Sequence, residues 1–266
     1  MSNKFDGVLL CVDFDGTLAW QGRISTENAA SIRRFQSEGG MFTVISGRAP
    51  DFFREYASSI TPNTYVCGMN GAWITDFQTG ESVLEQPMEA DAVYYAVTLL
   101  KKLPGVSEFH MQTKHGTFSS KIKGGSLVSP LPANINDVFK ILFIVSTDES
   151  DSATKLLATE ASDRFAISRS WINGLEIQRH GIDKGFAVRF LKERLAGKIS
   201  CVVGVGDYEN DIPLLRSSDL KVAEQDAVPA VKAVAEWVTS SCRYDSIAKV
   251  IEWLPTAING SKRIPY

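Results

Sequence analysis

Residues 8–18 read Val-Leu-Leu-Cys-Val-Asp-Phe-Asp-Gly-Thr-Leu, five consecutive apolar residues that end at two aspartates. An apolar run without polar alternation is typical of a strand buried on both faces, as in a parallel sheet covered by helices. Asp13 and Asp15 follow this predicted strand at its carboxyl end, where α/β sheets bind their ligands. The two carboxylates can face one crevice, and Gly16 can let backbone N–H groups approach an anion. An Asp-Gly turn with a capping aspartate explains the stretch equally well.

The same alternation of apolar runs and amphipathic stretches fills both ends of the chain. Further buried strands are predicted at 41–45, 65–67, 199–205 and 220–223, and helices between 25 and 39, at 51–60 and 211–216, and from about 228 and 245. Ser25 is the predicted cap of the first helix. Strands that alternate with helices and are apolar throughout indicate an α/β fold with a parallel sheet covered on both faces.

The middle of the chain has a different pattern. Strands at 73–76 and 81–85 flank Phe-Gln-Thr-Gly, which predicts a hairpin. Beyond it, helices are expected at 89–103 and 151–162, strands near 107–111, 117–120, 139–145, 164–170 and 175–178, and a Gly/Ser/Pro-rich loop at 124–132. We therefore expect a discontinuous core domain, residues 1–86 and 181–266, with a mixed α+β domain inserted at 87–180.

The composition is that of a globular protein with about two domains. Of the 266 residues, 44% are hydrophobic and 22% are charged, which excludes the disordered and fibrous classes. The 28 Lys+Arg and 31 Asp+Glu give a net charge of −3. This balance argues against nucleic acid or an anionic membrane as the main partner.

Compartment and redox state also follow from the composition. No apolar run approaches the roughly 18 residues that a bilayer span needs, and the apolar run near the start is too short for a secretory signal, so we expect a cytoplasmic protein. The four cysteines are far apart and show no Cys-x-x-Cys spacing, which is typical of reduced core thiols. No two of the three histidines have metal-ligand spacing on a helix, which argues against a structural zinc site.

Two further motifs place polar groups after a strand and at a helix start. Ser46 and Gly47 follow the strand at 41–45 and could hold a phosphate oxygen, although Ser46 could equally cap a helix before Pro50. Lys184 opens a predicted helix, where a lysine opposes the macrodipole unless it meets an anion. A solvated surface lysine is the alternative for that position.

The last motif, residues 203–211, reads Val-Gly-Val-Gly-Asp-Tyr-Glu-Asn-Asp. Its two glycines match part of a dinucleotide-binding fingerprint, but Glu209 stands where the third glycine of that fingerprint belongs. Glu209 instead lies between two aspartates, and carboxylate oxygens suit Mg²⁺, which pairs with substrate phosphate. Helix capping explains Asp211 but leaves Asp207 unexplained. Together the four motifs indicate Mg²⁺-assisted phosphoryl transfer through an aspartate.

These motifs resemble a known family. Haloacid dehalogenase-like (HAD) phosphohydrolases show the same four motifs in the same order, here Asp13-x-Asp15-Gly-Thr, Ser46-Gly-Arg, Lys184-Gly and Gly206-Asp207-x-x-Asn210-Asp211, and the resemblance covers essentially the whole chain. Met-Asn-Gly-Ala at 69–72 and the insertion between the second and third motifs are similar to the Cof-type branch, which carries a type IIB cap. The resemblance implies a Rossmann-like core, an inserted mixed α/β cap, Mg²⁺ dependence and phosphatase activity.

The resemblance also implies roles for the acidic residues. Asp13 would be the nucleophile that attacks phosphorus and would also bind Mg²⁺. Asp15 would be the general acid/base, and its backbone carbonyl would be a metal ligand. Asp207 would bind the metal, and Asp211 would support the metal directly or through water.

A second group of residues is implied to bind phosphate. Ser46 and Lys184 would hold the transferring phosphoryl group, beside the Gly47 N–H that the segment itself suggests. Asn210 would contact the phosphate or orient its loop.

The cap is expected to set leaving-group specificity, with a small phosphorylated metabolite such as a sugar phosphate as substrate. The candidate substrate-binding residues have charged, polar or aromatic side chains: Arg48, Asn70, His110, Lys114, His115, Arg169 and Trp171. For those in the cap, a packing or solvated role is the alternative. Two stretches depart from the family, which usually shows Gly-Asn-Ala and Asp-Gly there: Glu224-Gln225-Asp226-Ala227 and Asp245-Ser246. Both bear on the loop contacts beside the metal.

Two other functions are compatible with the motifs: a sugar phosphomutase of the same superfamily, and a sugar-phosphate-binding regulator without turnover. Release of free phosphate without a bisphosphate activator would exclude the first. Turnover of a generic aryl phosphate with Mg²⁺ would exclude the second. We expect no nucleic-acid or membrane partner, and a monomer or weak homodimer.

Overall fold

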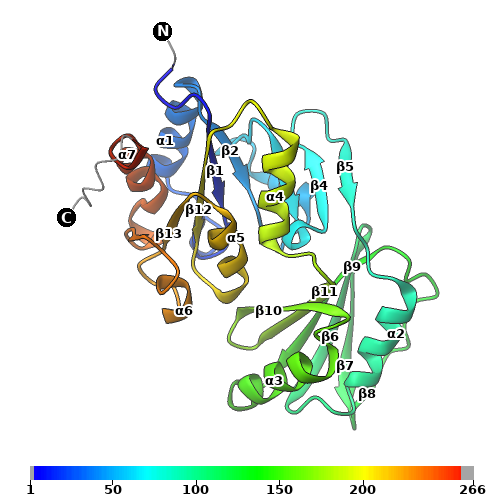
Figure 1. The fold of residues 1–266 in the computed structure, drawn as a ribbon. Helices are drawn as coiled ribbons and strands as arrows, with labels where there is room; N and C mark the ends of the chain where they lie inside the picture. Colours follow the sequence, from blue (N-terminus) through cyan, green and yellow to red (C-terminus); the bar gives the residue numbers. More distant parts are fainter. Residues whose placement is uncertain (1–2, 259–266) are drawn as a thin grey trace. The chain divides into compact units, whose positions relative to one another are not determined.

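The computed structural model describes residues 3–258, which fold into two compact units (Figure 1). Among the described residues, the core unit comprises 3–83 and 183–258, and the inserted unit comprises Leu84–Ile182. The chain therefore leaves the core unit once and returns to it once. That these units act as a core domain and an inserted cap domain stays a prediction.

The core unit is built on a five-stranded sheet whose pairings are all parallel, in the order β14-β13-β12-β1-β2. Its strands are β1 (Val8–Val12), β2 (Met41–Val44), β12 (Cys201–Gly206), β13 (Leu220–Ala223) and β14 (Trp237–Val238). β1 lies between β2 and β12, and all five of its residues are buried. Because the strands are parallel, their carboxyl ends meet at one edge, where α/β sheets place their ligands.

Helices cover both faces of this sheet (Figure 1). They are α1 (Thr26–Ser37), α4 (Lys184–Arg194), α5 (Ile212–Ser217), α6 (Pro229–Lys232) and α7 (Ser246–Ile258), with the 3-10 helices η4 (Glu209–Asp211) and η5 (Cys242–Tyr244). α1 packs against α7, and α4 packs against α5. The Ser25 hydroxyl accepts a hydrogen bond from the Asn28 N–H at 3.0 Å, so Ser25 caps α1 as predicted. The predicted α/β fold with a covered parallel sheet is confirmed.

Two predicted elements of the core unit differ from the structure. Residues 51–60 do not form an α-helix but the 3-10 helix η1 (Pro50–Tyr56). Residues three apart eclipse in a 3-10 helix, and the rings of Phe53 and Tyr56 both pack on the Phe14 ring, at 5.2 and 4.8 Å between centroids.

The third predicted strand does not extend the parallel sheet. β3 (Tyr65–Gly68) belongs to a separate antiparallel sheet with β4 (Trp73–Asp76) and β5 (Ser82–Glu85). A single parallel bridge, between Ile45 and Cys67, links it to the end of β2. The prediction was wrong because a short apolar run does not reveal which strand it pairs with, whereas the predicted hairpin of β4 and β5 is confirmed.

The inserted unit is an antiparallel six-stranded sheet in the order β10-β11-β9-β6-β7-β8, with helices packed on it. Its elements are α2 (Ala90–Leu99), β6 (Val106–Thr113), β7 (Gly116–Lys123), β8 (Ser126–Leu127), β9 (Val138–Val145), the 3-10 helix η3 (Thr147–Glu149), α3 (Ser150–Ala161), β10 (Phe165–Trp171) and β11 (Gly174–Arg179). β8 lies within the loop predicted at 124–132. Phe109, Phe143 and Leu157 belong to its apolar core. The mixed α+β prediction for this part of the chain is confirmed.

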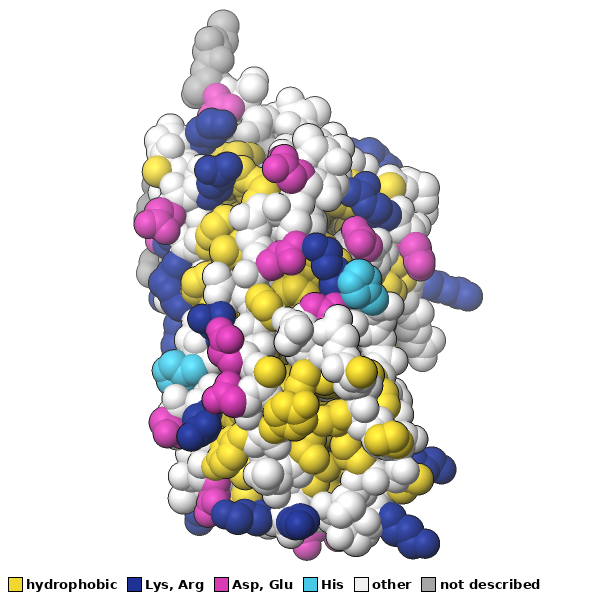
Figure 2. Space-filling view, turned by 90° about the vertical axis from the view of Figure 1, so that its right-hand side faces the viewer, with side chains coloured by type: hydrophobic (Ala, Val, Ile, Leu, Met, Phe, Trp, Pro, Cys, Tyr) yellow, Lys and Arg dark blue, Asp and Glu magenta, His cyan; other side chains and the backbone are white. Residues whose placement is uncertain are grey.

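The surface of the inserted unit carries apolar side chains. Figure 2 shows apolar side chains gathered in the lower half of the view. The exposed large hydrophobic side chains of this unit include Tyr94 and Val128.

All four cysteines are free, and three are buried, as predicted for core thiols. Among residues 3–258, no helix combines the length and apolar character that crossing a membrane requires.

Candidate active site

Three carboxylates meet at the carboxyl edge of the parallel sheet. Asp13 follows β1, Asp207 follows β12, and Asp211 is the last residue of η4. Each offers one oxygen, and the three oxygens lie within 4.8 Å of one another. We call these three residues the acidic cluster. Motifs nearly 200 positions apart thus meet because β1 and β12 are hydrogen-bonded neighbours.

Lys184 lies inside the acidic cluster. It is the first residue of α4, whose cap Asp183 accepts from the Phe186 N–H at 2.6 Å. The Lys184 Nζ donates to Asp13 Oδ1 and to Asp211 Oδ1, each at 2.6 Å. The side chain is only 1% exposed, so the surface-lysine alternative is wrong. An ammonium group is buried this deeply only when paired and hydrogen-bonded.

The charges of this cluster do not balance. Burial lowers the pKa of Lys184, but the carboxylates of Asp13 and Asp211 outweigh it and hold that pKa above its ordinary value. Burial, and then the charge of Asp211, raise the pKa of Asp13 well above its ordinary value, although Lys184 opposes them. Burial and Asp211 also raise the pKa of Asp207 to about 7. Three carboxylates share one ammonium group, and this excess negative charge favours a bound cation.

The loop after β1 is fitted closely to Asp207. The Thr17 hydroxyl donates to Asp207 Oδ1 at 2.8 Å, and Thr17 is fully buried. Gly16 has φ of +84°, and a Cβ there would lie 2.6 Å from Asp207 Oδ2. A glycine is therefore needed both for the backbone conformation and for the close approach. The Gly-Thr of the motif Asp-x-Asp-Gly-Thr is therefore explained by its contacts with Asp207, and not by an ordinary turn alone.

Asp15 lies next to the acidic cluster in the chain but has a different environment. Its two carboxylate oxygens accept from Arg48 Nε and Nη2, at 2.8 and 2.9 Å. Both side chains are half exposed. The Arg48 guanidinium, predicted to bind substrate, thus holds Asp15.

Ser46 is buried where the chain leaves β2. Its N–H donates to the Cys67 carbonyl at 2.9 Å, and its hydroxyl accepts from the Arg48 N–H at 3.3 Å. η1 is capped by Ala49 without a side-chain hydrogen bond, so the helix-cap alternative for Ser46 is wrong. Its carbonyl accepts from the Asn70 N–H at 2.8 Å.

Asn70 occupies a tight turn after β3. It is buried, with φ of +52° and ψ of +30°, a left-handed conformation that asparagine tolerates better than most residues. Gly71, with φ of +99°, would place a Cβ 2.9 Å from the Asp183 carbonyl oxygen. The turn therefore packs against the start of the helix that carries Lys184.

The loop after β12 is held by Asp211. Its Oδ2 accepts from the backbone N–H groups of Asp207 and Tyr208, at 2.9 and 3.2 Å. Its Oδ1 accepts from Lys184. Asn210 is buried in the same turn. Asp211 therefore fixes the loop and the lysine together.

A family model described as haloacid dehalogenase-like hydrolase matches residues 10–251, which include all four motifs. The chain belongs to the haloacid dehalogenase-like hydrolases. The assignment to this family and to its Cof-type branch, made from the motifs, is confirmed.

Several relatives of this HAD hydrolase are named phosphatases. The phosphoglycolate phosphatase 2 of Saccharolobus solfataricus is 35% identical over 250 residues, covering 92% of this chain and 91% of the relative. The 5-amino-6-(5-phospho-D-ribitylamino)uracil phosphatase YcsE of Bacillus subtilis is 26% identical over 247 residues, covering 91% and 94%. The HAD hydrolase described here is a phosphatase.

Solved structures share its fold. SMU.1108c from Streptococcus mutans UA159 aligns with a TM-score of 0.80 at 21% identity, covering 92% of this chain and 97% of that one. The HAD subclass IIB sugar phosphatase BT4131 aligns with a TM-score of 0.73 at 18% identity, covering 92% and 98%. At these identities the likeness establishes the fold.

The candidate substrate-binding residues of the inserted unit have partners within that unit. His110 contacts Ser119 Oγ at 2.7 Å and Glu108 Oε2 at 2.9 Å through its two ring nitrogens. Arg169 Nη1 donates to Asp151 Oδ1 at 2.6 Å. These polar contacts within the unit give both residues a structural role.

The other three candidates of this unit lie nearer to solvent. Lys114 Nζ donates to Glu85 Oε1 at 2.5 Å. The His115 side chain is 81% exposed, and Trp171 is exposed beside Gly174. That any of these candidates binds substrate stays a prediction.

Glu224 is a further buried acid of the HAD hydrolase, and its role was not predicted. It follows β13, as Asp13 follows β1, and it is fully buried. Among the described residues, no donor meets its two carboxylate oxygens with good hydrogen-bond geometry. Burial raises its pKa to about 8, although the Ser246 hydroxyl and the backbone of Cys242 favour the charged form. The rule that found Asp13 and Asp207, an acid at the end of a buried strand, also fits Glu224.

The raised pKa of Glu224 predicts a pH-dependent stability. A carboxyl group whose pKa rises on folding contributes stability that is complete below its unfolded value, near 4.5, and lost as pH passes about 8. Glu224→Gln should therefore unfold with about 2 kcal/mol more free energy than the wild type at pH 9 and with little difference at pH 5. Urea unfolding at both pH values measures this, and an equal effect at both would contradict it.

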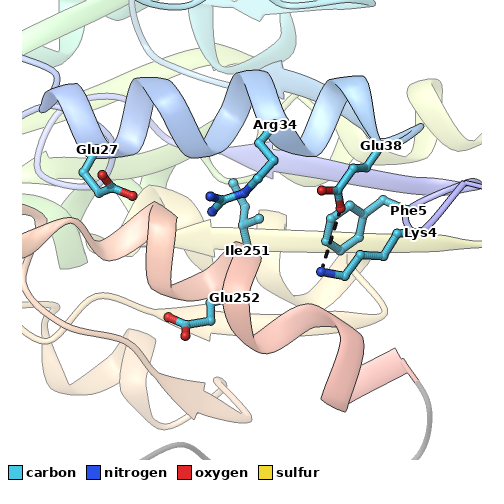
Figure 3. Close-up of a pocket in the computed structure, with 7 residues that line it drawn as sticks. All are labelled: Lys4, Phe5, Glu27, Arg34, Glu38, Ile251 and Glu252. Carbon is cyan, nitrogen blue, oxygen red and sulfur yellow. Dashed lines mark ion pairs between the residues drawn. The ribbon is translucent and has the colours of Figure 1, made fainter.

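One pocket of the core unit lies away from the acidic cluster (Figure 3). It has a volume of about 400 Å³ between α1 and α7 and is lined by Lys4, Phe5, Glu27, Arg34, Glu38, Ile251 and Glu252. Lys4 Nζ and Glu38 Oε2 form an ion pair at one end of it, at 3.8 Å. Lys4 precedes β1 whereas Asp13 follows it, so the pocket is not part of the candidate active site.

Proposed function

We propose that this phosphatase is Mg²⁺-dependent and hydrolyses a small phosphorylated metabolite, a sugar phosphate, through an aspartyl-phosphate on Asp13. One observation carries the proposal: the buried Lys184 amine, bonded at 2.6 Å to Asp13, lies in a cluster of three carboxylates. A positive charge next to a buried carboxylate can hold both a nucleophile and an incoming phosphate dianion. A cytoplasmic location and a monomeric or weakly dimeric state stay predictions from the sequence.

The donors of the acidic cluster fit Mg²⁺. They are carboxylate oxygens, which this hard cation prefers. Their combined negative charge exceeds the positive charge of Lys184. Asp13 and Asp207, with the carbonyl of Asp15, would hold the ion, and Asp211 would support it. When bound, Mg²⁺ neutralises charge on the acids and on the phosphoryl oxygens, which favours the ionised form of Asp13.

The side chains have separate tasks in the proposed reaction. An Asp13 oxygen attacks phosphorus, the bond from phosphorus to the leaving oxygen breaks, and Asp15 gives that oxygen a proton. Water then attacks the phosphorus, Asp15 takes a proton from it, and the Asp13 carboxylate is released with inorganic phosphate.

Four groups orient the phosphoryl group meanwhile: the Ser46 hydroxyl, the Gly47 N–H, Lys184 and Asn210. Phosphate esters hydrolyse extremely slowly in water, so charge neutralisation and positioning have to supply most of the acceleration.

The proposed substrate class draws on the relatives as well. BT4131 is named a sugar phosphatase, and YcsE is named for a phosphoribityl substrate. A panel of phosphorylated metabolites, assayed for free phosphate with and without Mg²⁺, tests the proposal. It predicts strong preference for one sugar phosphate, and release of phosphate without a bisphosphate activator. No release from any member of the panel would contradict it.

Mg²⁺ should also stabilise the folded protein. Binding to the native state alone raises the unfolding free energy by RT ln(1 + [L]/Kd), about 2.7 kcal/mol at one hundred times Kd. We therefore expect added Mg²⁺ to raise the melting temperature of the wild type and EDTA to abolish turnover. In Asp207→Asn the thermal shift should disappear, whereas in the exposed control Asp51→Asn it should persist. Equal shifts in both variants would contradict this metal site.

A further inference from the structure

The backbone of Arg48 is fixed beside Ser46. Its N–H donates to Ser46 Oγ at 3.3 Å, and its carbonyl accepts from the Met69 N–H at 2.8 Å. A Cβ at Gly68 would lie 2.6 Å from the same carbonyl oxygen. The backbone of Arg48 is therefore held at its N–H and at its carbonyl, which fixes the position from which its side chain extends.

The guanidinium of Arg48 is also fixed. It lies 4.7 Å from the centroid of the Phe52 ring, a cation–π contact. The Phe52 ring packs on the Phe14 ring, with 5.6 Å between centroids. Phe14 separates Asp13 from Asp15 in the chain. Phe52 therefore contacts both the Arg48 guanidinium and, through Phe14, the loop that carries both aspartates.

The contact with Asp15 uses a planar two-point geometry. Nε and Nη2 of Arg48 each meet a different carboxylate oxygen, at 2.8 and 2.9 Å. Two parallel hydrogen bonds fix the plane and the direction of a carboxylate as well as its position. A half-exposed aspartate without this contact could rotate freely, and proton transfer depends on geometry first.

We infer that Arg48 is the positioning residue of Asp15, and that it acts on the leaving group through Asp15 instead of binding substrate itself. When Asp15 carries its proton on one oxygen, the other oxygen still accepts from the guanidinium. When Asp15 takes the proton from water, both oxygens are available again. Arg48 can therefore keep the carboxyl oriented through both steps. The inference rests on the proposed role of Asp15.

A comparison of leaving groups tests this inference. A poor leaving group such as an alkoxide needs a proton from Asp15, whereas nitrophenolate leaves without one. The measured quantity is kcat/KM, which reports the first chemical step. Arg48→Gln should lower kcat/KM at least about 10-fold for an alkyl phosphate and less than about 3-fold for nitrophenyl phosphate. An equal loss on both substrates would mean that Arg48 binds the phosphoryl group, and would overturn the inference.

A double-mutant cycle supplies a second readout. If Arg48 acts only through Asp15, Arg48→Gln should cause no further loss in an Asp15→Asn background. Arg48→Lys, which keeps the charge but offers one contact point, should lose less activity than Arg48→Gln on the alkyl substrate. Additive losses in the cycle would overturn the inference.

The structure offers a matched control in Arg54. Its side chain is 49% exposed, as that of Arg48 is, and it pairs with Asp51. It lies 5.7 Å over the Phe77 ring. Arg54→Gln should leave kcat/KM unchanged on both substrates. If Arg48→Gln fails to fold, Arg48→Lys and its cycle with Asp15→Asn carry the same test.

Failure of the inference is distinguishable from failure of the proposed function. If Asp15→Asn loses activity only on the alkyl substrate and Arg48→Gln does not, the inference alone fails. If Asp15→Asn shows no dependence on the leaving group, the proposed role of Asp15 fails and the inference fails with it.

Discussion

Replacement of Asp13 by asparagine should abolish turnover while the protein stays folded. The amide cannot attack phosphorus, so we expect kcat to fall by about 10⁴-fold or more, as for other covalent nucleophiles. The fold should tolerate the change because burial and Asp211 disfavour the charged form of Asp13. Lys184 keeps its second partner, Asp211. The melting temperature without Mg²⁺ should therefore equal or exceed that of the wild type.

Steady-state release of phosphate and thermal unfolding measure the two halves of this result. Asp51→Asn is the matched control, because Asp51 is an exposed aspartate of η1 in the same core unit. It should change neither kcat nor the melting temperature. Wild-type activity in Asp13→Asn would exclude Asp13 as the nucleophile.

Replacement of Lys184 by methionine should damage both stability and activity. Methionine fills similar space but removes the two ion pairs, each at 2.6 Å, that the Lys184 amine makes with Asp13 and Asp211. Removing one partner of a buried ion pair costs about 3–5 kcal/mol. Asp13 and Asp207, whose pKa values burial already raises, should then be favoured in their neutral forms. Stability should therefore be retained below their unfolded pKa values and lost as pH rises through about 7, the raised pKa of Asp207.

Urea unfolding of Lys184→Met at pH 5 and pH 8 without Mg²⁺ tests this pH dependence. The control is Lys192→Met, because Lys192 forms an exposed ion pair with Asp219 at 2.9 Å, worth about 1 kcal/mol or less. The destabilisation by Lys184→Met should exceed that of the control and be larger at pH 8. A loss no greater than that of Lys192→Met, or one independent of pH, would contradict the account of the cluster.

The sequence predicted the main sheet and the acidic cluster because both depend on one local signal. Buried parallel strands are apolar throughout, and the acids follow them directly. Asp13 after β1 and Asp207 after β12 had to meet once those strands were neighbours. Asp211 came with Asp207, because only a few residues separate them in the chain.

The state of Lys184 required the structure. A lysine at the start of a helix reads the same whether it faces solvent or the inside of the protein. Only the packing of α4 against α5 and η4 places its amine between two carboxylates. Its partners Asp13 and Asp211 lie 171 and 27 positions away in the sequence, separations that no local pattern encodes.

The contacts of Arg48 and of the inserted unit were also beyond local patterns. Arg48 reaches Asp15 across 33 positions, and its side chain could equally have pointed to solvent. His110 and Arg169 are polar residues on strands, where the sequence does not distinguish a ligand contact from the partners they have, Glu108 and Asp151. The short strand β3 was misassigned for the same reason, because pairing partners are not local properties.

Trapping the covalent intermediate tests the central claim most directly. The enzyme would be mixed with substrate and Mg²⁺, quenched in acid within the first turnover, and treated with borohydride, which reduces an acyl phosphate to an alcohol. Peptide mass spectrometry should then find the reduced side chain at residue 13 in the wild type and none in Asp13→Asn. A reduced side chain at another residue, or none at any residue during active turnover, would contradict a phosphorylated Asp13.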